Sequence, residues 1–430
     1  MFIVFYSQLK EHLLKKTKLN SCLIKRGEMK SILLLFVLVN TTVFAGDWEI
    51  LGHNQTRTEL NGTDFNNSTY GKVFTSMKTR VQVSNSFDNI KFFVQIQDSR
   101  LLGQSGSSVS NLGNFDLFQG YLLIDDLIGN MDAQVGRFEI SYGTERFLGG
   151  LGWHFVGRSF DGARLKFDFG GSNLDLFGAV LKEDDPYKAT SQPGLQTVTN
   201  ASSQSLYGAW YQLRSIANNK IDVFYYWDID RTPGINLSRM NLGASWWSSF
   251  GNLNTTVEGA YQFGSSNDVD ISAYILAVLI DYSINKNIFS IGADLISGTE
   301  VGTNNAINSF QANYGTNHKF YGLMDYFINI PLHTGGLGLN DIQAKYKRKL
   351  GNKLSAGLNF HHFMSNVPDA NDDNVWGQEL DLLLIWKFSQ SLKITWGGSV
   401  FLPGQLMENR WSGNSDPAFW SFLMLTANVK

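Results

Sequence analysis

"KVFTSMKTRVQVSNSFDNIKFFVQIQ", residues 72–97, reads as two strands joined by the short turn "SFDN". Apolar and threonine side chains occupy every second position from Val73 to Val83, and Lys78 and Arg80 lie on the opposite face. The second half of the segment repeats this alternation. A period of two residues with one apolar face predicts β-strands rather than helices. Soluble β-sandwiches show the same alternation, so this pattern alone does not decide the class of protein.

The spacing of turns along the rest of the chain is more informative. Short turns of about three to five residues alternate with longer connections, which gives eight short turns, nine longer loops and eighteen strands. The longer connections fall at residues 61–70, 101–113, 142–158, 184–202, 231–236, 264–268, 300–338, 365–375 and 403–417. All seven prolines lie in or beside them, because proline cannot donate to a strand ladder. This layout predicts an all-β, transmembrane antiparallel β-barrel of about 18 strands, with short periplasmic turns and long extracellular loops.

The N-terminal segment has the pattern of a secretory signal. "KRGEMKSILLLFVLVNTTVFA", residues 25–45, has a basic start, a short apolar run and a small-residue end, which is typical of a cleaved signal peptide. An N-terminal membrane anchor is the alternative. Cleavage near Ala45 predicts the outer membrane of a Gram-negative cell as the location. The predicted division is 1–28, an over-long start or N-terminal extension; 29–45, the signal peptide; and 46–430, the barrel.

Charge and cysteine content narrow the range of functions. Residues 1–45 hold seven of the 35 Lys and Arg residues and two of the 38 Asp and Glu residues, which leaves residues 46–430 with 28 against 36, a net charge of −8. This balance argues against a nucleic-acid partner. The single cysteine, Cys22, lies before the predicted cleavage position. The exported chain is therefore expected to be stabilised without disulfides.

Alternation along the strands assigns charged side chains to the lumen. The inward candidates are Lys78, Arg80, Lys91, Arg137, Arg164, Lys166, Asp222, Asp294, Glu379 and Asp381. Arginine side chains suit carboxylates and sulfates, so Arg80, Arg137 and Arg164 are expected to form a basic wall that sets selectivity. The alternative is that charges of opposite sign simply pair across the lumen.

Arg137 is a special case among these residues. Strict alternation from Met131 through Val135 would place it against lipid, at a cost of roughly 2–4 kcal/mol at the bilayer midplane. We therefore expect a bulge or strand end near Gly136 that turns Arg137 inward. The alternative is a position at the outer rim, above the membrane.

"GRFEISYGTERFLGGLGWHFVGRSFDGARLKF", residues 136–167, contains a glycine-rich loop between two ordinary strands. Glycines allow tight turns with positive φ, and the loop is predicted to fold back into the barrel and narrow it. The residues expected to do so are Arg146, Trp153, His154, Arg158 and Asp161. Packing on the outer rim is the alternative. The segment 300–338 is a second candidate plug, with Tyr314, His318, Lys319, Tyr321, Asp325, Tyr326 and His333.

Three blocks of sequence resemble one known family. "GRFEISYGTERFLGGLGWHFVGRSFDGARL" (136–165) closely resembles the signature of the alginate export family of outer-membrane barrels. "NHKFYGLMDYFINIPLHTGGLGLNDIQAKYK" (317–347) is similar to that family's late long loop and following strand, and the segments 377–404 and 416–430 are similar to its C-terminal strands. The resemblance implies an eighteen-stranded monomeric channel with an electropositive constriction, through which polyanionic polysaccharide passes.

These observations predict a passive channel that is not an enzyme and uses no cofactor and no metal. Its partners are expected to be outer-membrane lipid, an anionic sugar polymer or small solutes, and periplasmic export or assembly proteins. A porin for small-molecule uptake is the main alternative, and a structural barrel whose loops bind a partner is another. A barrel lipase using Ser159, His154 and Asp161 would need a geometry that sequence spacing does not provide.

Overall fold

The computed structural model describes residues 47–104, 114–183 and 203–430. The predicted extension, the signal peptide and its cleavage position near Ala45 lie outside these residues. In the part of the chain that is described, no helix combines the length and the apolar character needed to cross a membrane.

Eighteen strands form the wall of a barrel, and β14 (Ala306–Ile307) is a two-residue strand within a loop. The first nine wall strands are β1 (Asp47–Gly62), β2 (Lys72–Phe87), β3 (Ile90–Leu101), β4 (Phe115–Ile128), β5 (Met131–Phe138), β6 (Phe160–Asp168), β7 (Ser172–Glu183), β8 (Ser203–Leu213) and β9 (Asn219–Asp230). The other nine are β10 (Leu237–Phe250), β11 (Leu253–Ser266), β12 (Val269–Ile284), β13 (Asn287–Ile296), β15 (Leu339–Lys349), β16 (Leu354–Met364), β17 (Val375–Lys387), β18 (Leu392–Pro403) and β19 (Ala418–Val429). The short helix α3 (Gln405–Arg410) follows β18.

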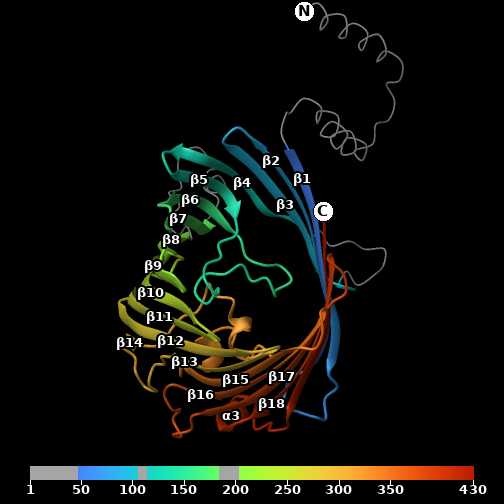
Figure 1. Cartoon of the computed structure of the whole chain (residues 1–430). Helices are drawn as coiled ribbons and strands as arrows, with labels where there is room; N and C mark the ends of the chain where they lie inside the picture. Colours follow the sequence, from blue (N-terminus) through green and yellow to red (C-terminus); the bar gives the residue numbers. More distant parts are fainter. Residues whose placement is uncertain (1–46, 105–113, 184–202) are drawn as a thin grey trace, which may run out of the picture. The chain divides into compact units, whose positions relative to one another are not determined.

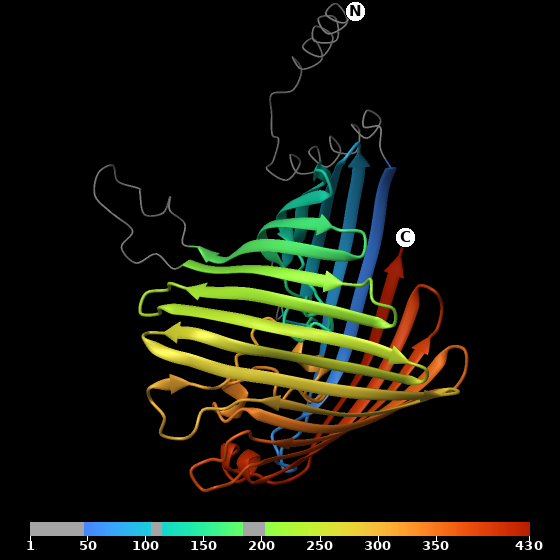
Figure 2. The ribbon, with the colours of Figure 1, turned by 60° about the vertical axis from the view of Figure 1, so that its left-hand side comes forward.

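The wall closes by pairing of the first strand with the last. β1 and β19 run antiparallel, in register from Gly52 opposite Val429 to Gly62 opposite Phe419. Figures 1 and 2 show the strands side by side around a continuous ring. A closed ladder leaves no strand edge without hydrogen-bond partners, which is the requirement for backbone in lipid. The prediction of an antiparallel barrel of about 18 strands is confirmed.

One predicted loop is wrong. The longer connection expected at 264–268 is a two-residue turn between β11 and β12, made by Asn267 and Asp268. Both residues have positive φ, 48° and 66°. Asn and Asp tolerate this conformation, and two consecutive positive φ values are the requirement of a tight type I′ hairpin.

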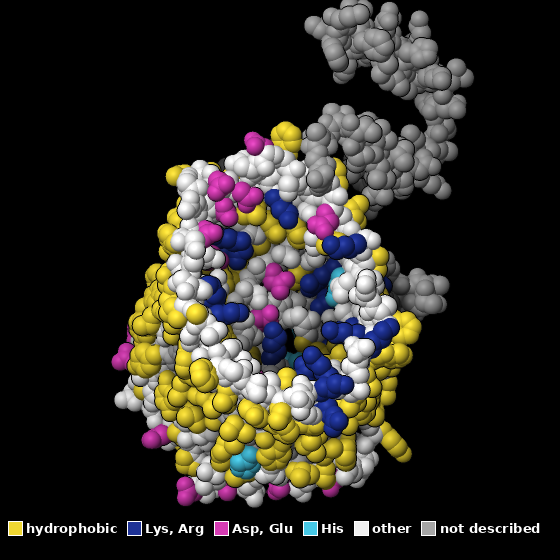
Figure 3. Space-filling view, viewed as in Figure 1, with side chains coloured by type: hydrophobic (Ala, Val, Ile, Leu, Met, Phe, Trp, Pro, Cys, Tyr) yellow, Lys and Arg dark blue, Asp and Glu magenta, His cyan; other side chains and the backbone are white. Residues whose placement is uncertain are grey.

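The two faces of the wall differ as a membrane barrel requires, and β12 shows the pattern clearly. Tyr274 and Leu276 are 45 % and 42 % exposed on the outer face, whereas Ala273 and Ile275 are 0 % and 2 % exposed on the inner face. Hydrophobic side chains cover much of the outer wall that is visible in Figure 3, and Lys and Arg side chains, with Asp and Glu side chains among them, line a central hollow.

The interior contains an apolar core instead of open water alone. Two inner loops, 139–159 between β5 and β6 and 297–338 between β13 and β15, contribute buried side chains to it. From the loops come Ile140, Leu148, Phe310, Tyr321, Phe327 and Ile330, and from the wall come Trp210, Phe224, Phe363 and Phe401. Complete burial of one such side chain stabilises a fold by roughly 1.5–3 kcal/mol, so this core holds both loops inside the barrel.

Candidate functional site

The inner loop 139–159 crosses the lumen from the β5–β6 wall. In Figure 1 this segment, coloured teal, runs inside the ring of strands. Ile140 and Leu148 are 0 % exposed. The Tyr142 hydroxyl donates to Asp175 Oδ2 on β7 at 2.8 Å, and Thr144 Oγ1 donates to Glu258 Oε1 on β11 at 2.7 Å. The loop is therefore anchored to strands on different parts of the wall.

Arg146 is the strongest anchor of this loop. Its Nε lies 2.9 Å from Glu258 Oε2, and its Nη1 lies 2.7 Å from Asp294 Oδ2. Nη1 also donates to the Tyr321 hydroxyl at 3.1 Å, and the guanidinium lies 4.0 Å from the centre of the Phe320 ring. Burial alone would lower the pKa of this guanidinium, but the neighbouring carboxylates outweigh burial and hold the pKa above its usual value. Arg146 thus ties the first inner loop to β11, to β13 and to the second inner loop.

The loop glycines allow close approach to these surfaces. Gly143 has φ +56°, and a Cβ there would lie 3.1 Å from the Trp247 ring. A Cβ at Gly150 would lie 1.6 Å from Glu139 Oε1. A larger residue at either position would push the loop away from its neighbours.

The Arg158 side chain joins the two inner loops through hydrogen bonds. Its Nη1 donates to Gly149 O at 3.1 Å and its Nη2 donates to Asn313 O at 3.0 Å. Burial lowers the pKa of this guanidinium to about 10, which still leaves it charged at neutral pH.

Trp153 forms a second contact, which joins the two inner loops to each other and to β1. Its ring stacks 4.0 Å from the His318 ring, and the Arg57 guanidinium lies 3.9 Å from the ring centre. His318 Nδ1 lies 2.6 Å from Asp325 Oδ1. His154 is the next residue after Trp153, and burial lowers the pKa of its imidazole. Both faces of Trp153 are therefore occupied by protein groups.

The Glu145 carboxylate makes the contact between the two inner loops sensitive to pH. Partial burial alone would raise the pKa of its carboxyl, but hydrogen bonds from Lys319, Thr316 and Ser141 outweigh burial and hold the pKa below its ordinary value of 4.5. A lowered pKa contributes stability that is present at neutral pH and is lost as pH falls through it. In planar bilayers from pH 7 to pH 3, we expect the native current to fluctuate more as pH falls below the ordinary carboxyl pKa of 4.5. Glu145→Gln carries no charge at any pH, so its fluctuations should be large throughout and independent of pH. Equal pH profiles for the two proteins would refute this role.

The tight contact between the loops predicts a second effect. A Cβ at Gly315 would lie 2.3 Å from the Arg146 backbone oxygen, whereas a Cβ at Gly152 meets nothing within 4 Å. Gly315→Ala is therefore expected to separate the loops, at a cost of about 1–3 kcal/mol, and to raise the noise of single-channel current. Gly152→Ala is the matched control and should behave as the native protein. Indistinguishable noise in the two variants would contradict the contact.

The basic side chains of β2 donate hydrogen bonds to the first inner loop and are therefore largely covered by it. Lys78 Nζ donates to Gly152 O at 3.1 Å and to His154 O at 3.2 Å, and the residue is 2 % exposed. Arg80 Nη2 donates to Val156 O at 3.1 Å and remains half-buried. Lys78 thus lies inside the barrel but is covered by the loop.

Three other basic candidates lie on the inner face of β3 and β6. Arg164 Nη2 donates to Gln134 Oε1 at 2.7 Å, and its Nη1 lies 3.8 Å from Asp175 Oδ2. Lys91 and Lys166 are half-buried. Lys166 stands opposite Asp175 in the ladder of β6 and β7. These residues keep partial access to solvent.

Arg137 and Asp161 are not on the inner face of the wall, which corrects two sequence predictions, although both line a cavity of about 320 Å³ at the strand ends with Arg158 and Tyr314. Gln134 and Phe138 are 4 % and 0 % exposed on the inner face of β5, so Arg137 lies on the outer face. Arg137 Nη1 lies 2.6 Å from Asp161 Oδ2, and their side chains are 33 % and 59 % exposed. Gly136 does have a positive φ of 130°, but the pairing of β5 with β6 keeps its register. A bulge was expected to turn the Arg137 side chain inward. Instead, the ion pair with Asp161 at the end of the two strands neutralises its charge.

The four acidic candidates point inward but are covered, so they do not line an open passage. Asp222, Asp294, Glu379 and Asp381 are each 0–1 % exposed. Asp222 Oδ2 accepts from Trp210 Nε1 at 2.8 Å. Glu379 Oε1 accepts from the Met324 backbone at 2.8 Å, and Asp381 Oδ1 accepts from Ser399 Oγ at 2.6 Å. Their role in the structure is to hold neighbouring strands and loops.

Sequence reasoning missed several anchoring residues. Arg57, Glu258 and the buried pair Asp341–His361, 2.8 Å apart, were not among the candidates. For Arg57 a signal exists, because alternation places it on one face of its strand with His53 and Glu59. Nothing in the local pattern indicates the partners of Glu258, which lie in a distant loop.

Cavities remain between the loops and at the short-turn end of the barrel. One of about 340 Å³ lies between them and is lined by His154, Arg158, Asn313 and His318 among others. Two lie at the end of the barrel that carries the short turns, one of about 730 Å³ beside Arg80 and one of about 700 Å³ beneath Gly143.

Comparisons with known proteins agree with this geometry. Residues 74–421 match the family model described as "Alginate export". No curated protein matches the sequence. Among solved structures, the chain is similar to OccAB4 of Acinetobacter baumannii, with a TM-score of 0.61 and 11 % identity over 91 % of this chain and 100 % of that chain. It is also similar to Pseudomonas aeruginosa OpdL, with a TM-score of 0.60 and 11 % identity over 89 % of this chain and 99 % of that chain, and to Pseudomonas aeruginosa OccK3 (OpdO), with a TM-score of 0.59 and 11 % identity over 89 % and 96 %. At this identity the structural likeness shows the fold alone.

Proposed function

The chain belongs to the alginate export family of outer-membrane channels, and from this premise we propose that it passes anionic sugar oligomers or polymers through a lumen narrowed by its two inner loops. Transport is passive and follows the concentration gradient. The channel acts as a monomer in outer-membrane lipid, formed by residues 46–430 after removal of the signal peptide.

The observation that carries this proposal is the unequal exposure of inward charges. The acidic side chains Asp222 and Asp294 are buried and paired with Arg214 and Arg146, whereas Arg80 and Lys91 stay partly exposed. Buried carboxylates that are already paired repel a passing anion less than exposed ones. Basic side chains that remain accessible attract carboxylates and sulfates. The passage therefore favours anions although the chain as a whole carries net negative charge.

The extent to which the loops fill the lumen favours a second function. Cavities of about 340–730 Å³ have the size of sites for small molecules. A porin for small anionic solutes would use the same basic side chains.

Flux from proteoliposomes separates the two functions. Vesicles with the purified protein are loaded with galacturonate monomer, galacturonate oligomers or neutral maltose oligomers of equal length, and their release is followed over time. Release of acidic oligomers faster than neutral ones supports the sugar-polymer channel. Release of monomer only supports the small-solute porin, and equal release of acidic and neutral sugars contradicts selectivity for anions.

A further inference from the structure

The cavity of about 700 Å³ at the short-turn end of the barrel has the composition of a ligand site. It is lined by Gly143, Arg214, Ile216, Ala217, Asn218, Asn219, Lys220, Trp247 and Ser249. These residues come from the tip of the first inner loop, the turn between β8 and β9, and the ends of β9 and β10. All of them lie in the described part of the chain, and none is acidic.

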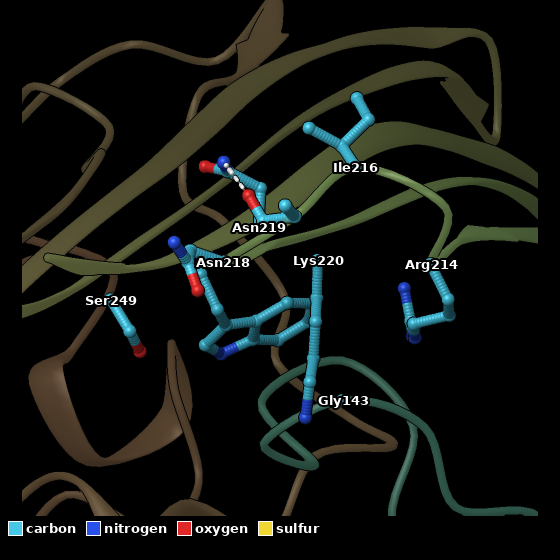
Figure 4. A pocket seen from close by; sticks show the side chains of 9 residues that line it. Gly143, Arg214, Ile216, Asn218, Asn219, Lys220 and Ser249 are labelled. Carbon is cyan, nitrogen blue, oxygen red and sulfur yellow. Dashed lines mark hydrogen bonds between the residues drawn. The ribbon is translucent and has the colours of Figure 1, made fainter.

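The positive charge of this cavity is carried by two side chains with different surroundings. Arg214 donates to Leu213 O and Ile221 O at 3.0 Å and pairs with Asp222 at 2.5 Å, so its guanidinium is fixed in place and its charge is balanced. Lys220 is exposed and adds one positive charge. In Figure 4 the Lys220 side chain extends toward the loop segment that carries Gly143, and Arg214 lies to one side of it. A single carboxylate is the complement of this arrangement.

Trp247 adds an aromatic surface beside these cations. Alternation along β10 places it on the inner face with Ser245, which is 1 % exposed, whereas Trp246 is 41 % exposed on the lipid face. Gly143 contacts the benzene edge of the Trp247 ring, since a Cβ there would lie 3.1 and 3.2 Å from Cη2 and Cζ2. An indole ring presents a large, rigid apolar face and a polar N–H, which suits the C–H face of a pyranose ring. Asn218 and Ser249 supply amide and hydroxyl groups that match sugar hydroxyls.

We infer that Trp247, Lys220 and Arg214 form a binding site for one carboxylated sugar ring at the short-turn mouth of the channel. The ring stacks on Trp247, and its carboxylate lies between Lys220 and Arg214. This inference rests on the proposed function, because it names the chemical class that the passage receives. The site also lies against the tip of the first inner loop, so an occupied site contacts the segment that narrows the lumen.

Equilibrium binding to the purified protein in detergent tests this site. Isothermal titration with a galacturonate tetrasaccharide is carried out on the native protein, Trp247→Ala, Lys220→Gln and Trp396→Ala. We expect each of the first two substitutions to weaken binding about tenfold, equivalent to about 1.4 kcal/mol. Trp396→Ala should leave binding unchanged, because that ring is 37 % exposed on the lipid face of β18 and does not line the cavity. Lys220→Gln preserves size and removes charge, so its result stands even if Trp247→Ala folds poorly.

Three outcomes separate this site from the channel function. Equal affinities in all four proteins overturn the site. If the native protein also releases acidic oligomers from proteoliposomes, the proposed function stands without the site. Failure of the native protein both to bind and to release acidic sugar overturns the two together.

Discussion

Replacing Arg146 with methionine is expected to enlarge the channel. The substitution leaves Glu258 and Asp294 buried, at 2 % and 1 % exposure, without their cation. Breaking a buried ion pair on one side costs about 3–5 kcal/mol. A change of this size shifts a two-state equilibrium by roughly a hundredfold or more. The first inner loop should therefore detach from the wall, while the closed strand ladder keeps the barrel folded.

Single-channel recording measures this effect as a larger conductance step. Arg100→Met is the matched control, because Arg100 forms its ion pair with Asp98 on its own strand and should leave conductance unchanged. Adding Glu258→Gln and Asp294→Asn to Arg146→Met should restore part of the native conductance, because neutral partners no longer repel each other inside the barrel. Native conductance in Arg146→Met itself would show that the loop does not limit the current.

The second large effect concerns ion selectivity. Changing Lys91, Arg164 and Lys166 together to glutamine should shift the reversal potential under a salt gradient toward cation preference. At about 10 Å in a water-like dielectric each charge contributes about 0.4 kcal/mol, of opposite sign for anions and cations. Salt screening over about 8–10 Å reduces this energy to roughly a third, so three charges together should change the permeability ratio roughly fivefold. The reversal potential is expected to shift because these three side chains stay partly accessible on the inner wall.

A matched control removes the same charge elsewhere. Lys286, Lys353 and Lys387 lie in or beside short turns and are exposed. Their triple glutamine variant should shift the reversal potential much less, because salt screens charges beyond about 8–10 Å. Equal shifts in the two triple variants would mean that net charge, and not the wall, sets the preference.

The barrel could be predicted from sequence because its determinants are local. Alternation within a strand, the length of a turn and the position of a proline each depend on a few neighbouring residues. The failure at Asn267–Asp268 is also local: the two residues adopt the left-handed conformation, and this allows a turn shorter than the pattern indicated.

The lumen was harder to predict because its contacts are distant in sequence. Arg146 pairs with Glu258 and Asp294, which lie 112 and 148 residues away, and no local pattern indicates these partners. For Arg137, alternation along its strand indicated the outer face, and the expected bulge near Gly136 led to the inward assignment. That expectation did not consider Asp161, which stands directly opposite Arg137 on the next strand.

One signal for the inner loops was present in the sequence and was missed. A lumen filled with water needs polar inward positions, but β9 and β12 carry Phe224, Tyr226, Ala273 and Ile275 there, all buried. Strands that are apolar on both faces require something to cover the inner one. The long loops of this chain are the segments available to do so.

The most direct test of the account is single-channel current of the purified protein in a planar bilayer, with galacturonate oligomers or neutral dextrins of equal length added to each side in turn. The account predicts steady current that the acidic oligomers interrupt and the neutral sugars do not. Current that is equally affected by both sugars, or by neither, would contradict a passage selective for anionic sugars.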